Sequence, residues 1–176
     1  MLIDEIRTSR LVLSCLNLHD VNLEYVNWLN DPEVNQYLEV RHTVVTLHSQ
    51  KQFVRILQES DHSFILGIYL EESILIGTIK AGPINGFHQT AEIGLMIGAK
   101  QYWGNGFGTE AIAGVCDYFS KQPLIRKLNA GVQAPNTGSA KAFLKNDFLL
   151  EGKRMGQYLN REGVAVDELL FGKFLR

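Results

Sequence analysis

Residues 98–112 read Gly98-Ala99-Lys100-Gln101-Tyr102-Trp103-Gly104-Asn105-Gly106-Phe107-Gly108-Thr109-Glu110-Ala111-Ile112. The apolar run at residues 93–97 before this stretch predicts a strand, and apolar residues at every fourth position from Phe107 to Phe119 predict a helix after it. The three alternating glycines therefore lie at a strand-to-helix turn. Glycine leaves the backbone N–H groups at the start of a helix open to an anion, most often a phosphate. The stretch therefore predicts a phosphate site.

Two familiar phosphate-binding motifs do not fit this turn. A dinucleotide fingerprint would need a third glycine where Thr109 stands. A P-loop beginning at Gly104 would need glycine at that same place and lysine after it, where Glu110 stands. The glycines could also serve only to give the backbone positive φ angles in an ordinary β–α turn. From the glycines alone, both interpretations stay open.

Composition limits the class of protein. The chain has 176 residues, 45% of them hydrophobic and 20% charged, so we expect a single domain with a sizeable core over residues 1–176. The net charge of −2 provides no basic surface for nucleic acid. Cys15 and Cys116 match neither a disulfide framework nor a zinc spacing, so we expect no metal and a reducing, cytoplasmic location. The apolar run at residues 11–13 is too short for a signal sequence or a membrane span, so no membrane partner is expected.

The pattern along the chain predicts an α/β fold. Strands joined by short turns should pair antiparallel, whereas the strands on either side of the glycine turn and its helix form a βαβ unit and should be parallel. We expect a mixed, mostly antiparallel sheet flanked by helices, in which the parallel strands splay and open a cleft. Phe53, Ile56 and Leu57 should form the buried face of a helix that Ser49 caps. Strands are expected at residues 10–16, 63–69, 74–80, 89–97, 127–133, 148–155 and 167–174, helices at 18–29, at 32–38 and from 49, 107 and 135, a reversal at 70–73 and a loop at 82–86.

Three segments resemble the GNAT superfamily, the acetyl-CoA-dependent N-acetyltransferases. Residues 93–98 with 102–111 resemble its motif A, and Asn136-x-x-Ser139 with residues 145–152 is similar to a second conserved segment. Residues 28–34, Trp-Leu-Asn-Asp-Pro-Glu-Val, resemble the opening of the branch that contains ribosomal-protein N-acetyltransferases and enzymes acting on small amines and nucleotide-linked amino sugars. The resemblance covers essentially the whole chain.

The chain departs from the superfamily pattern at three positions. Trp103 stands where motif A usually has Arg or Gln, and Asp147 stands where a glycine is usual. Phe143 stands where many members have a tyrosine that protonates the leaving thiolate, which phenylalanine cannot do.

The resemblance implies transfer of acetyl from acetyl-CoA to a primary amine. It implies that backbone N–H groups of the glycine turn hold the pyrophosphate, that a backbone N–H near Met96 or Ile97 binds the thioester carbonyl, and that Asn136 binds the pantetheine arm. Glu110 would repel phosphate, so we expect it to point away from the ligand. The implied acetyl-CoA-binding residues are Met96, Ile97, Trp103, Gly104, Asn105, Gly106, Phe107, Gly108, Thr109 and Asn136.

Two residues are candidates for proton transfer. Strand alternation places Glu92 on the face of Gly94 and Met96, where it could act as the base that takes a proton from the amine. The alternative for Glu92 is an ordinary strand carboxylate that faces solvent or a cation. Ser139 could give a proton to the leaving thiolate, or it could only satisfy a free N–H at the start of a helix.

The acceptor amine is the least determined feature of the sequence. Tyr37, Glu39, Arg41 and His42 form a candidate acceptor site, in which Arg41 could hold an anionic group; the alternative is a solvated helix end. A small amine, with an amino sugar or its nucleotide-linked form as the candidate, is our first hypothesis. The N-terminus of a ribosomal protein or peptide is the second, and a non-catalytic acyl-CoA-binding module is the third. The closing strand pair offers an edge through which two copies could form a homodimer.

Overall fold

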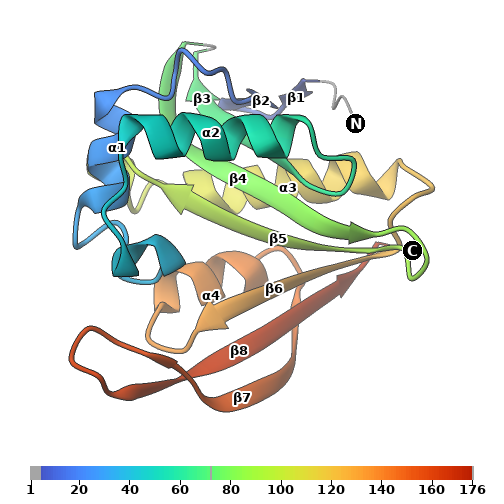
Figure 1. Cartoon of the computed structure of the whole chain (residues 1–176). Helices are drawn as coiled ribbons and strands as arrows, with labels where there is room; N and C mark the ends of the chain where they lie inside the picture. Colours follow the sequence, from blue (N-terminus) through green and yellow to red (C-terminus); the bar gives the residue numbers. More distant parts are fainter. Residues whose placement is uncertain (1–4, 72, 176) are drawn as a thin grey trace.

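The computed structural model describes residues 5–71 and 73–175. Its strands form one sheet of eight, in the order β1-β2-β3-β4-β5-β6-β8-β7 (Figure 1). The strands are β1 (Ile6–Arg7), β2 (Leu11–Cys15), β3 (Phe64–Leu70), β4 (Ile74–Asn85), β5 (Thr90–Ile97), β6 (Lys127–Gln133), β7 (Leu149–Leu159) and β8 (Ala165–Phe174). The helices are α1 (Leu23–Asn30), α2 (Leu47–Gln58), α3 (Phe107–Ser120) and α4 (Thr137–Leu144), with 3₁₀ turns η1 (Glu39–His42) and η2 (Lys100–Tyr102).

One parallel pair interrupts the antiparallel sheet, as the sequence predicts. β5 and β6 are parallel, and they pair only from Thr90 opposite Lys127 to Glu92 opposite Asn129. Beyond these residues the two strands separate, while β5 remains paired with β4 as far as Ile97. The predicted mixed sheet and its splayed central strands are confirmed, and the opening lies at the carboxyl ends of β5 and β6.

The two faces of the sheet are covered differently. α3 and α4 pack on one face over the larger hydrophobic cluster, which contains Ile112, Phe119 and Phe143. α1 and α2 pack on the other face over a smaller cluster that contains Tyr25 and Met96. In Figure 1, α2 lies across β3 and β4, and α3 runs behind the sheet.

The N-terminal helices differ from the expectation. α1 begins at Leu23, five residues later than predicted, because the side chain of Asn22 accepts the Tyr25 N–H and caps it there. The short helix expected at residues 32–38 is wrong, since this segment forms turns. The Asp31 carboxylate accepts the Glu33 N–H at 2.9 Å, and the Asn35 amide donates to the Leu29 carbonyl at 2.7 Å. Side chains thus bind backbone groups that a helix would otherwise use.

The buried face of α2 also differs from the expectation. Thr46, not Ser49, is the N-cap, and Ser49 completes a capping box with it. The residues that face the sheet include Gln50 and Val54, whereas Phe53 is 43% exposed and Ile56 is 59% exposed. The predicted face was therefore correct only for Leu57. The buried positions Gln50, Val54 and Leu57 are four and three residues apart and form one side of the helix, and Phe53 and Ile56 lie outside it.

Turns or loops were expected at both ends of β4. β4 continues to Asn85, so the loop expected at residues 82–86 is wrong; the strand passes through an irregularity between Ala81 and Ile84. The reversal expected at residues 70–73 joins β3 to β4, and Leu70 pairs with Ile74. Residue 72 of that reversal lies outside the described residues.

Candidate active site

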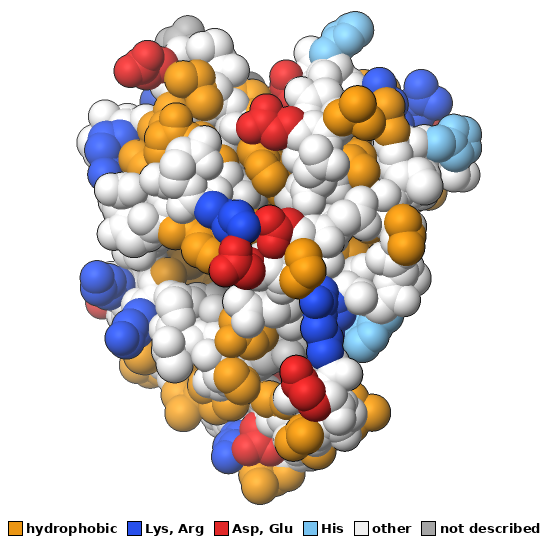
Figure 2. All heavy atoms as spheres, turned by 90° about the vertical axis from the view of Figure 1, so that its left-hand side faces the viewer, with side chains coloured by type: hydrophobic (Ala, Val, Ile, Leu, Met, Phe, Trp, Pro, Cys, Tyr) orange, Lys and Arg blue, Asp and Glu red, His pale blue; other side chains and the backbone are white. Residues whose placement is uncertain are grey.

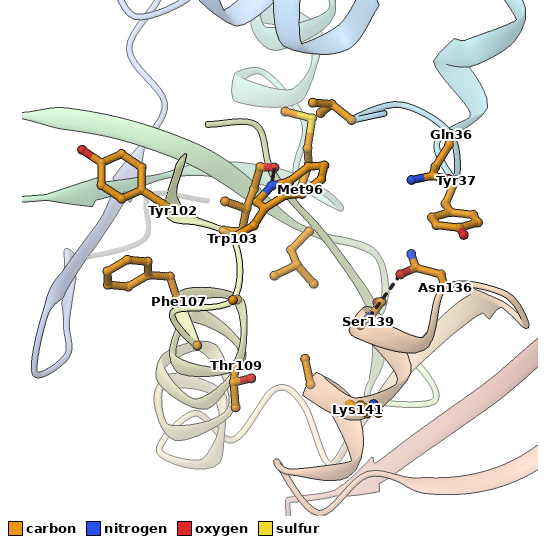
Figure 3. Close-up of a pocket in the computed structure, with 18 of the residues that line it drawn as sticks. Gln36, Tyr37, Met96, Tyr102, Trp103, Phe107, Thr109, Asn136, Ser139 and Lys141 are labelled. Atoms are coloured by element: carbon orange, nitrogen blue, oxygen red, sulfur yellow. Dashed lines mark hydrogen bonds between the residues drawn. The ribbon is translucent and has the colours of Figure 1, made fainter. Parts of the chain in front are cut away.

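A cavity of about 480 Å³ lies at the opening between β5 and β6. Its walls come from four segments: the end of β5, the glycine turn with the start of α3, the start of α4, and the segment after α1. Figure 3 shows Trp103, Phe107 and Thr109 on one side of it and Asn136, Ser139 and Lys141 on the other. The lining residues predicted from the sequence are Tyr37, Met96, Ile97, Trp103, Gly104, Gly106, Phe107, Gly108, Thr109, Asn136 and Ser139.

The glycine turn has the backbone that an anion site needs. Gly104 and Gly106 have φ angles of 78° and 82°, a region that favours glycine. Gly106 is the N-cap of α3 and provides no side-chain bond to the first turn of the helix. The helix N–H groups there consequently remain open toward the cavity. Gly108 has an ordinary helical backbone and is close to Leu95, since a Cβ at this position would lie 3.2 Å from the Leu95 Cδ1.

Glu110 points away from the cavity, as predicted. Its carboxylate accepts hydrogen bonds from the Thr8 hydroxyl at 2.7 Å, the Ser9 hydroxyl at 2.9 Å and the Arg10 backbone N–H at 2.7 Å. The Arg10 guanidinium binds the same carboxylate at 2.7 Å. Burial raises the pKa of Glu110, but these hydrogen bonds outweigh it, so its pKa lies below the ordinary value. The negative charge of Glu110 is thus neutralised behind the turn.

Arg10 also holds the glycine turn from behind. Its guanidinium donates to the Asn105 carbonyl at 3.1 Å and lies 4.4 Å from the centre of the Phe107 ring. Asn105 does not line the cavity, and its side chain donates to the Trp103 carbonyl. No pattern in the sequence indicates this role of Arg10, because 95 residues separate it from Asn105.

Trp103 fixes the end of β5. Its indole N–H donates to the Ile97 carbonyl at 2.7 Å (Figure 3). On the other side of β5, the Gly98 N–H donates to the Ile76 carbonyl of β4 at 2.9 Å. Alternate residues of an antiparallel strand direct their backbone groups to opposite sides. It follows that Met96 pairs with β4, whereas the N–H groups of Leu95 and Ile97 face the opening.

The start of α4 presents polar groups to the cavity. The Asn136 side-chain oxygen accepts the Ser139 N–H at 3.2 Å and caps the helix, which leaves the Asn136 amide nitrogen to point away from the helix (Figure 3). The Ser139 hydroxyl has no hydrogen-bond partner among residues 5–71 and 73–175. Lys141 and Lys145 also line the cavity. Neither lysine was predicted as a site residue, although their i, i+4 spacing after the Asn-x-x-Ser motif was a visible signal.

Phe143 does not reach the cavity. It is buried against Phe148, with ring centres 5.0 Å apart, and against Phe171 at 6.1 Å. The ring therefore belongs to the core. Neither its chemistry nor its place allows it to act as the acid.

The segment after α1 is fixed against the cavity and the β7–β8 hairpin. The Tyr37 hydroxyl donates to the Pro135 carbonyl at 3.3 Å, and the Gln133 amide donates to the Tyr37 carbonyl at 3.4 Å. Lys100, just before the glycine turn, forms ion pairs with Asp31 at 2.8 Å and Glu33 at 2.5 Å. Residues 31–38 thus connect the phosphate side of the site to the carboxyl end of β6.

Three residues expected in the acceptor site do not line the cavity, namely Glu39, Arg41 and His42. The Arg41 side chain is only 1% exposed. Its guanidinium donates to the Leu38 carbonyl at 3.0 Å and to the Leu159 carbonyl at 3.1 Å, while its Nε has no partner. The structure therefore does not present Arg41 to an anionic group. Glu39 and His42 are exposed on η1 beside it.

Glu92 lies outside the cavity, on the α1–α2 face of the sheet. It is exposed on β5, at the last parallel pair before β5 and β6 separate. Within the described residues it forms no ion pair or hydrogen bond. It thus stands at the edge of the opening, on the opposite face from the glycine turn and α4.

The described part of the chain contains no group of three or more His, Cys, Asp or Glu side chains that could hold a metal ion. Among these same residues, no helix has the length and apolarity needed to cross a bilayer.

These features define a class of fold in which an open helix start, of the kind that binds phosphate, lies beside the opening of a splayed sheet. Residues 10–149 match the family model of the acetyltransferase (GNAT) domain. The chain is 29% identical over 174 residues to the uncharacterized N-acetyltransferase p20 of Bacillus licheniformis, covering 96% of this chain and 95% of that protein. It is 30% identical over 165 residues to the uncharacterized N-acetyltransferase YoaA of Bacillus subtilis (strain 168), covering 92% of each.

Solved structures share the fold. The microcin C7 self-immunity acetyltransferase MccE, solved with acetyl-CoA and AMP, superposes with a TM-score of 0.82 at 21% identity over 95% of this chain and 93% of that chain. Spermidine N-acetyltransferase from Vibrio cholerae, solved with CoA and spermine, superposes with a TM-score of 0.85 at 19% identity over 96% of this chain and 97% of that chain. RimL, a ribosomal L7/L12 α-N-protein acetyltransferase solved with CoA, superposes with a TM-score of 0.86 at 17% identity over 97% of this chain and 98% of that chain. The chain belongs to the GNAT acetyltransferases and is an acetyl-CoA-dependent N-acetyltransferase.

Proposed function

We propose that this enzyme acetylates the primary amine of a small molecule. The observation that carries the proposal is the opening between β5 and β6. This opening connects two groups on opposite faces of the sheet. The cavity with the open helix N–H groups lies on the α3–α4 face, and the carboxylate of Glu92, which is unpaired among the described residues, lies on the α1–α2 face. A thioester lying in the cavity and an amine approaching from the other face would meet there.

The cavity residues fit the parts of acetyl-CoA. The open N–H groups at the start of α3 suit the pyrophosphate. Lys141 and Lys145 would add the positive charge that Trp103 does not supply at the usual Arg or Gln position. The free N–H groups of Leu95 and Ile97 suit an extended amide-containing arm, and the Asn136 amide nitrogen would donate to the same arm.

The chemistry requires one carbonyl donor and one base. The Ile97 N–H, rather than that of Met96, would bind the thioester oxygen where negative charge develops; such a donor contributes about 10²–10³ in rate. Glu92, directly or through water, would take the proton that the amine loses as its nitrogen bonds to the carbonyl carbon. The carbon–sulfur bond then breaks, and the Ser139 hydroxyl could give a proton to the sulfur. A thiol of pKa about 8.5 also leaves as a thiolate without this help.

The fixed position of the segment after α1 favours a small amine over a peptide. Residues 31–38 are fixed to the carboxyl end of β6 by Tyr37 and Gln133, and they narrow the approach to the opening. N-terminal acetylation of a ribosomal protein or peptide is the second candidate, since the RimL fold is so similar. The neighbours solved with spermine or AMP show that small molecules occupy related folds. Because both cysteines are free, we place the enzyme in the cytoplasm.

A thiol-release assay with acetyl-CoA tests the proposal. The panel comprises alkyl amines, amino sugars, nucleotide-linked amino sugars and N-terminal peptides. We expect one class of small amine to release CoA, and Glu92→Gln to lower kcat by about 10²–10⁴ with little change in the KM for acetyl-CoA. Glu59→Gln, an exposed carboxylate at the end of α2, is the matched control. Turnover of peptides alone would overturn the small-amine proposal, and an unimpaired Glu92→Gln enzyme would overturn the role of the base.

A further inference from the structure

A hydrogen-bonded group on the β7–β8 hairpin lies beside the opening. The Tyr158 hydroxyl donates to Glu168 Oε1 at 2.8 Å, and Arg154 donates to Glu168 Oε2 at 2.9 Å. Glu168 is only 5% exposed, and its carboxylate rests on Gly131 of β6, where a Cβ would collide with it. The glycine at this position leaves the space that the buried carboxylate occupies.

Strand register places this group on the same face as Glu92. Glu168 lies opposite Gln133, and Gln133 donates to Tyr37 on the acceptor side. Gly131 is two residues along β6 from Asn129, the parallel partner of Glu92. Since side chains two apart in a strand share a face, the Tyr158 hydroxyl and Glu92 border the same opening from its two sides.

The surroundings of Tyr158 are negative. Burial, the hydrogen bond to Glu168 and the negative charges of Glu168, Glu39 and Glu92 together raise the pKa of Tyr158 to about 12. The hydroxyl keeps its proton and donates it in the hydrogen bond to Glu168. Only the lone pairs of its oxygen then remain for a ligand, so it can accept a hydrogen bond but has none to give.

The positive side chains on this face are mostly occupied by the protein. Arg154 is bound to Glu168 although its side chain is 57% exposed, and Arg161 donates to the Asn35 side-chain oxygen at 2.6 Å. The buried Arg41 binds two carbonyls, and its Nη1 lies 3.5 Å from the Glu39 carboxylate. Lys80 lies opposite Gly94 on β4 and forms no ion pair with the described residues. Figure 2, which views the molecule from the left-hand side of Figure 1, shows both signs of charge spread over the surface, so recognition must depend on local groups rather than on one broad field.

We propose that the acceptor is an amine with a second positive charge and no phosphate, and that the Tyr158 oxygen, oriented by Glu168, receives its reacting ammonium beside Glu92. Glu39, exposed on η1, attracts the second charge. An ammonium group has only donors to offer, and it therefore matches a site whose exposed groups are lone pairs and carboxylates. A nucleotide-linked amino sugar would bring phosphates toward Glu92, which forms no ion pair with the described residues, and toward the carboxylates of Glu168 and Glu39, which Arg154 and Arg41 neutralise in part. This inference rests on the small-amine function proposed above.

A series of three amines tests the charge preference. 1,4-Diaminobutane, n-butylamine and 4-aminobutyrate carry the same reacting group and differ in the charge at the far end: positive, absent and negative. With the wild-type enzyme, we expect kcat/KM to fall by about threefold or more at each step, as one partly exposed charge pair provides. The difference should shrink in 0.5 M NaCl because salt screens exposed charges. Equal values, or a preference for 4-aminobutyrate, would overturn the proposal.

Two variants test the residues. Tyr158→Phe removes the oxygen but keeps the ring, and we expect kcat/KM for 1,4-diaminobutane to fall by about tenfold while the KM for acetyl-CoA is unchanged. Glu39→Gln should reduce the ratio of kcat/KM for 1,4-diaminobutane to kcat/KM for n-butylamine by about threefold. Tyr69→Phe is the matched control, since the Tyr69 hydroxyl makes the same kind of bond, to Asp20 at 2.7 Å, at the other end of the sheet. Equal losses in Tyr158→Phe and Tyr69→Phe would show a structural effect only and overturn the assignment.

Failure of this inference can be distinguished from failure of the proposed function. If amino sugars react but kcat/KM for the three amines does not follow the charge at their far end, the function stands and the inference is wrong. If only peptides react, the function is wrong, and the inference is judged by calorimetric binding of the same three amines to the CoA-bound protein. Tighter binding of the diamine would support it, and equal binding would overturn it.

Discussion

At the scale of single residues, tryptophans account for much of how the site is held. The Trp28 ring lies on Gly98, so closely that a Cβ at Gly98 would overlap the ring, and Trp103 donates to the Ile97 carbonyl. Both tryptophans stand in segments that resemble family motifs, but the sequence could not indicate their partners. Trp28 comes from α1 and Gly98 from the end of β5, so only the folded chain brings them together.

Gly98→Ala should destabilise the protein because the new methyl group must displace the Trp28 ring. We expect a loss of about 1–3 kcal/mol in the free energy of unfolding, measured by urea denaturation. Gly94→Ala on the same strand is the control, since a Cβ there meets nothing within 4 Å. If both variants were equally stable, the close contact between Gly98 and Trp28 would not be a constraint.

Glu110 should make stability depend on pH. Its pKa is lowered in the folded state, so its contribution is present in full above the ordinary glutamate pKa of about 4.3 and is lost as the pH falls through the lower folded pKa. Glu110→Gln should therefore cost about 1–2 kcal/mol near pH 7 and much less near pH 3. Urea denaturation from pH 3 to 7 measures this difference.

The control for Glu110 is Asp117→Asn. Asp117 also lies on α3, but its partner Lys121 is four residues along the same helix and both side chains are exposed. Such a pair contributes about 0.5 kcal/mol or less. A cost for Glu110→Gln that did not change with pH would show that packing, rather than charge, holds the start of α3.

At the scale of elements, helices and strands were predicted most accurately from the sequence where a single local pattern determines the element. β6 has the predicted bounds, and the glycine turn and the helix after it were identified from periodicity and glycine spacing. The prediction failed where contacts with the rest of the fold decide: packing on the sheet selects Gln50, Val54 and Leu57 as the buried face of α2, and the hydrogen bond from Asn35 to Leu29 replaces a helix by turns. Arg41 was predicted to be an acceptor residue because the sequence could not show that it is buried. One of its partners, the Leu159 carbonyl, is 118 residues away.

Helix α4 allows the two roles of Asn136 to be separated. Asn136→Asp keeps the oxygen that caps the helix but removes the amide N–H donor. We expect an unchanged or slightly higher melting temperature, because Asp is as good an N-cap as Asn, and a KM for acetyl-CoA raised by about two- to tenfold. Asn136→Ala should lose both the cap and the donor. An unchanged KM in Asn136→Asp would mean that Asn136 only caps the helix.

At the scale of the whole molecule, the sheet consists of two parts joined weakly. β4 pairs with β5 over seven residue pairs and β6 pairs with β8 over seven, but β5 and β6 share only three. We propose that the parts act as one domain because α3 and α4 pack against each other across the junction. The residues that line the cavity come from both parts, so a bound ligand would join them.

The homodimer stays a prediction. β7 is the last strand of the sheet, and its exposed residues include Leu149, Leu150 and Met155. A second copy could pair along this edge. We expect sedimentation at micromolar concentration to show a dimer that Leu150→Lys converts to a monomer. A wild-type monomer at that concentration would remove the prediction.

Acetyl-CoA should stabilise the molecule by bridging its two parts, and hydrogen exchange can show where. A ligand at 100 times its Kd adds about 2.7 kcal/mol to the folded state, which for a chain of this length corresponds to a rise in melting temperature of roughly 5–10 °C. The amides of Leu95 and Ile97 face the opening, so their exchange should slow when the pantetheine arm binds. The Met96 amide is already bound to β4, so its exchange should slow only as much as the whole protein is stabilised. Adenosine 3′,5′-bisphosphate, which lacks the arm, should raise the melting temperature without specific protection of Ile97. Specific protection of Met96 instead of Ile97 would reverse the assignment of the carbonyl donor, because both conclusions depend on the same alternation along β5.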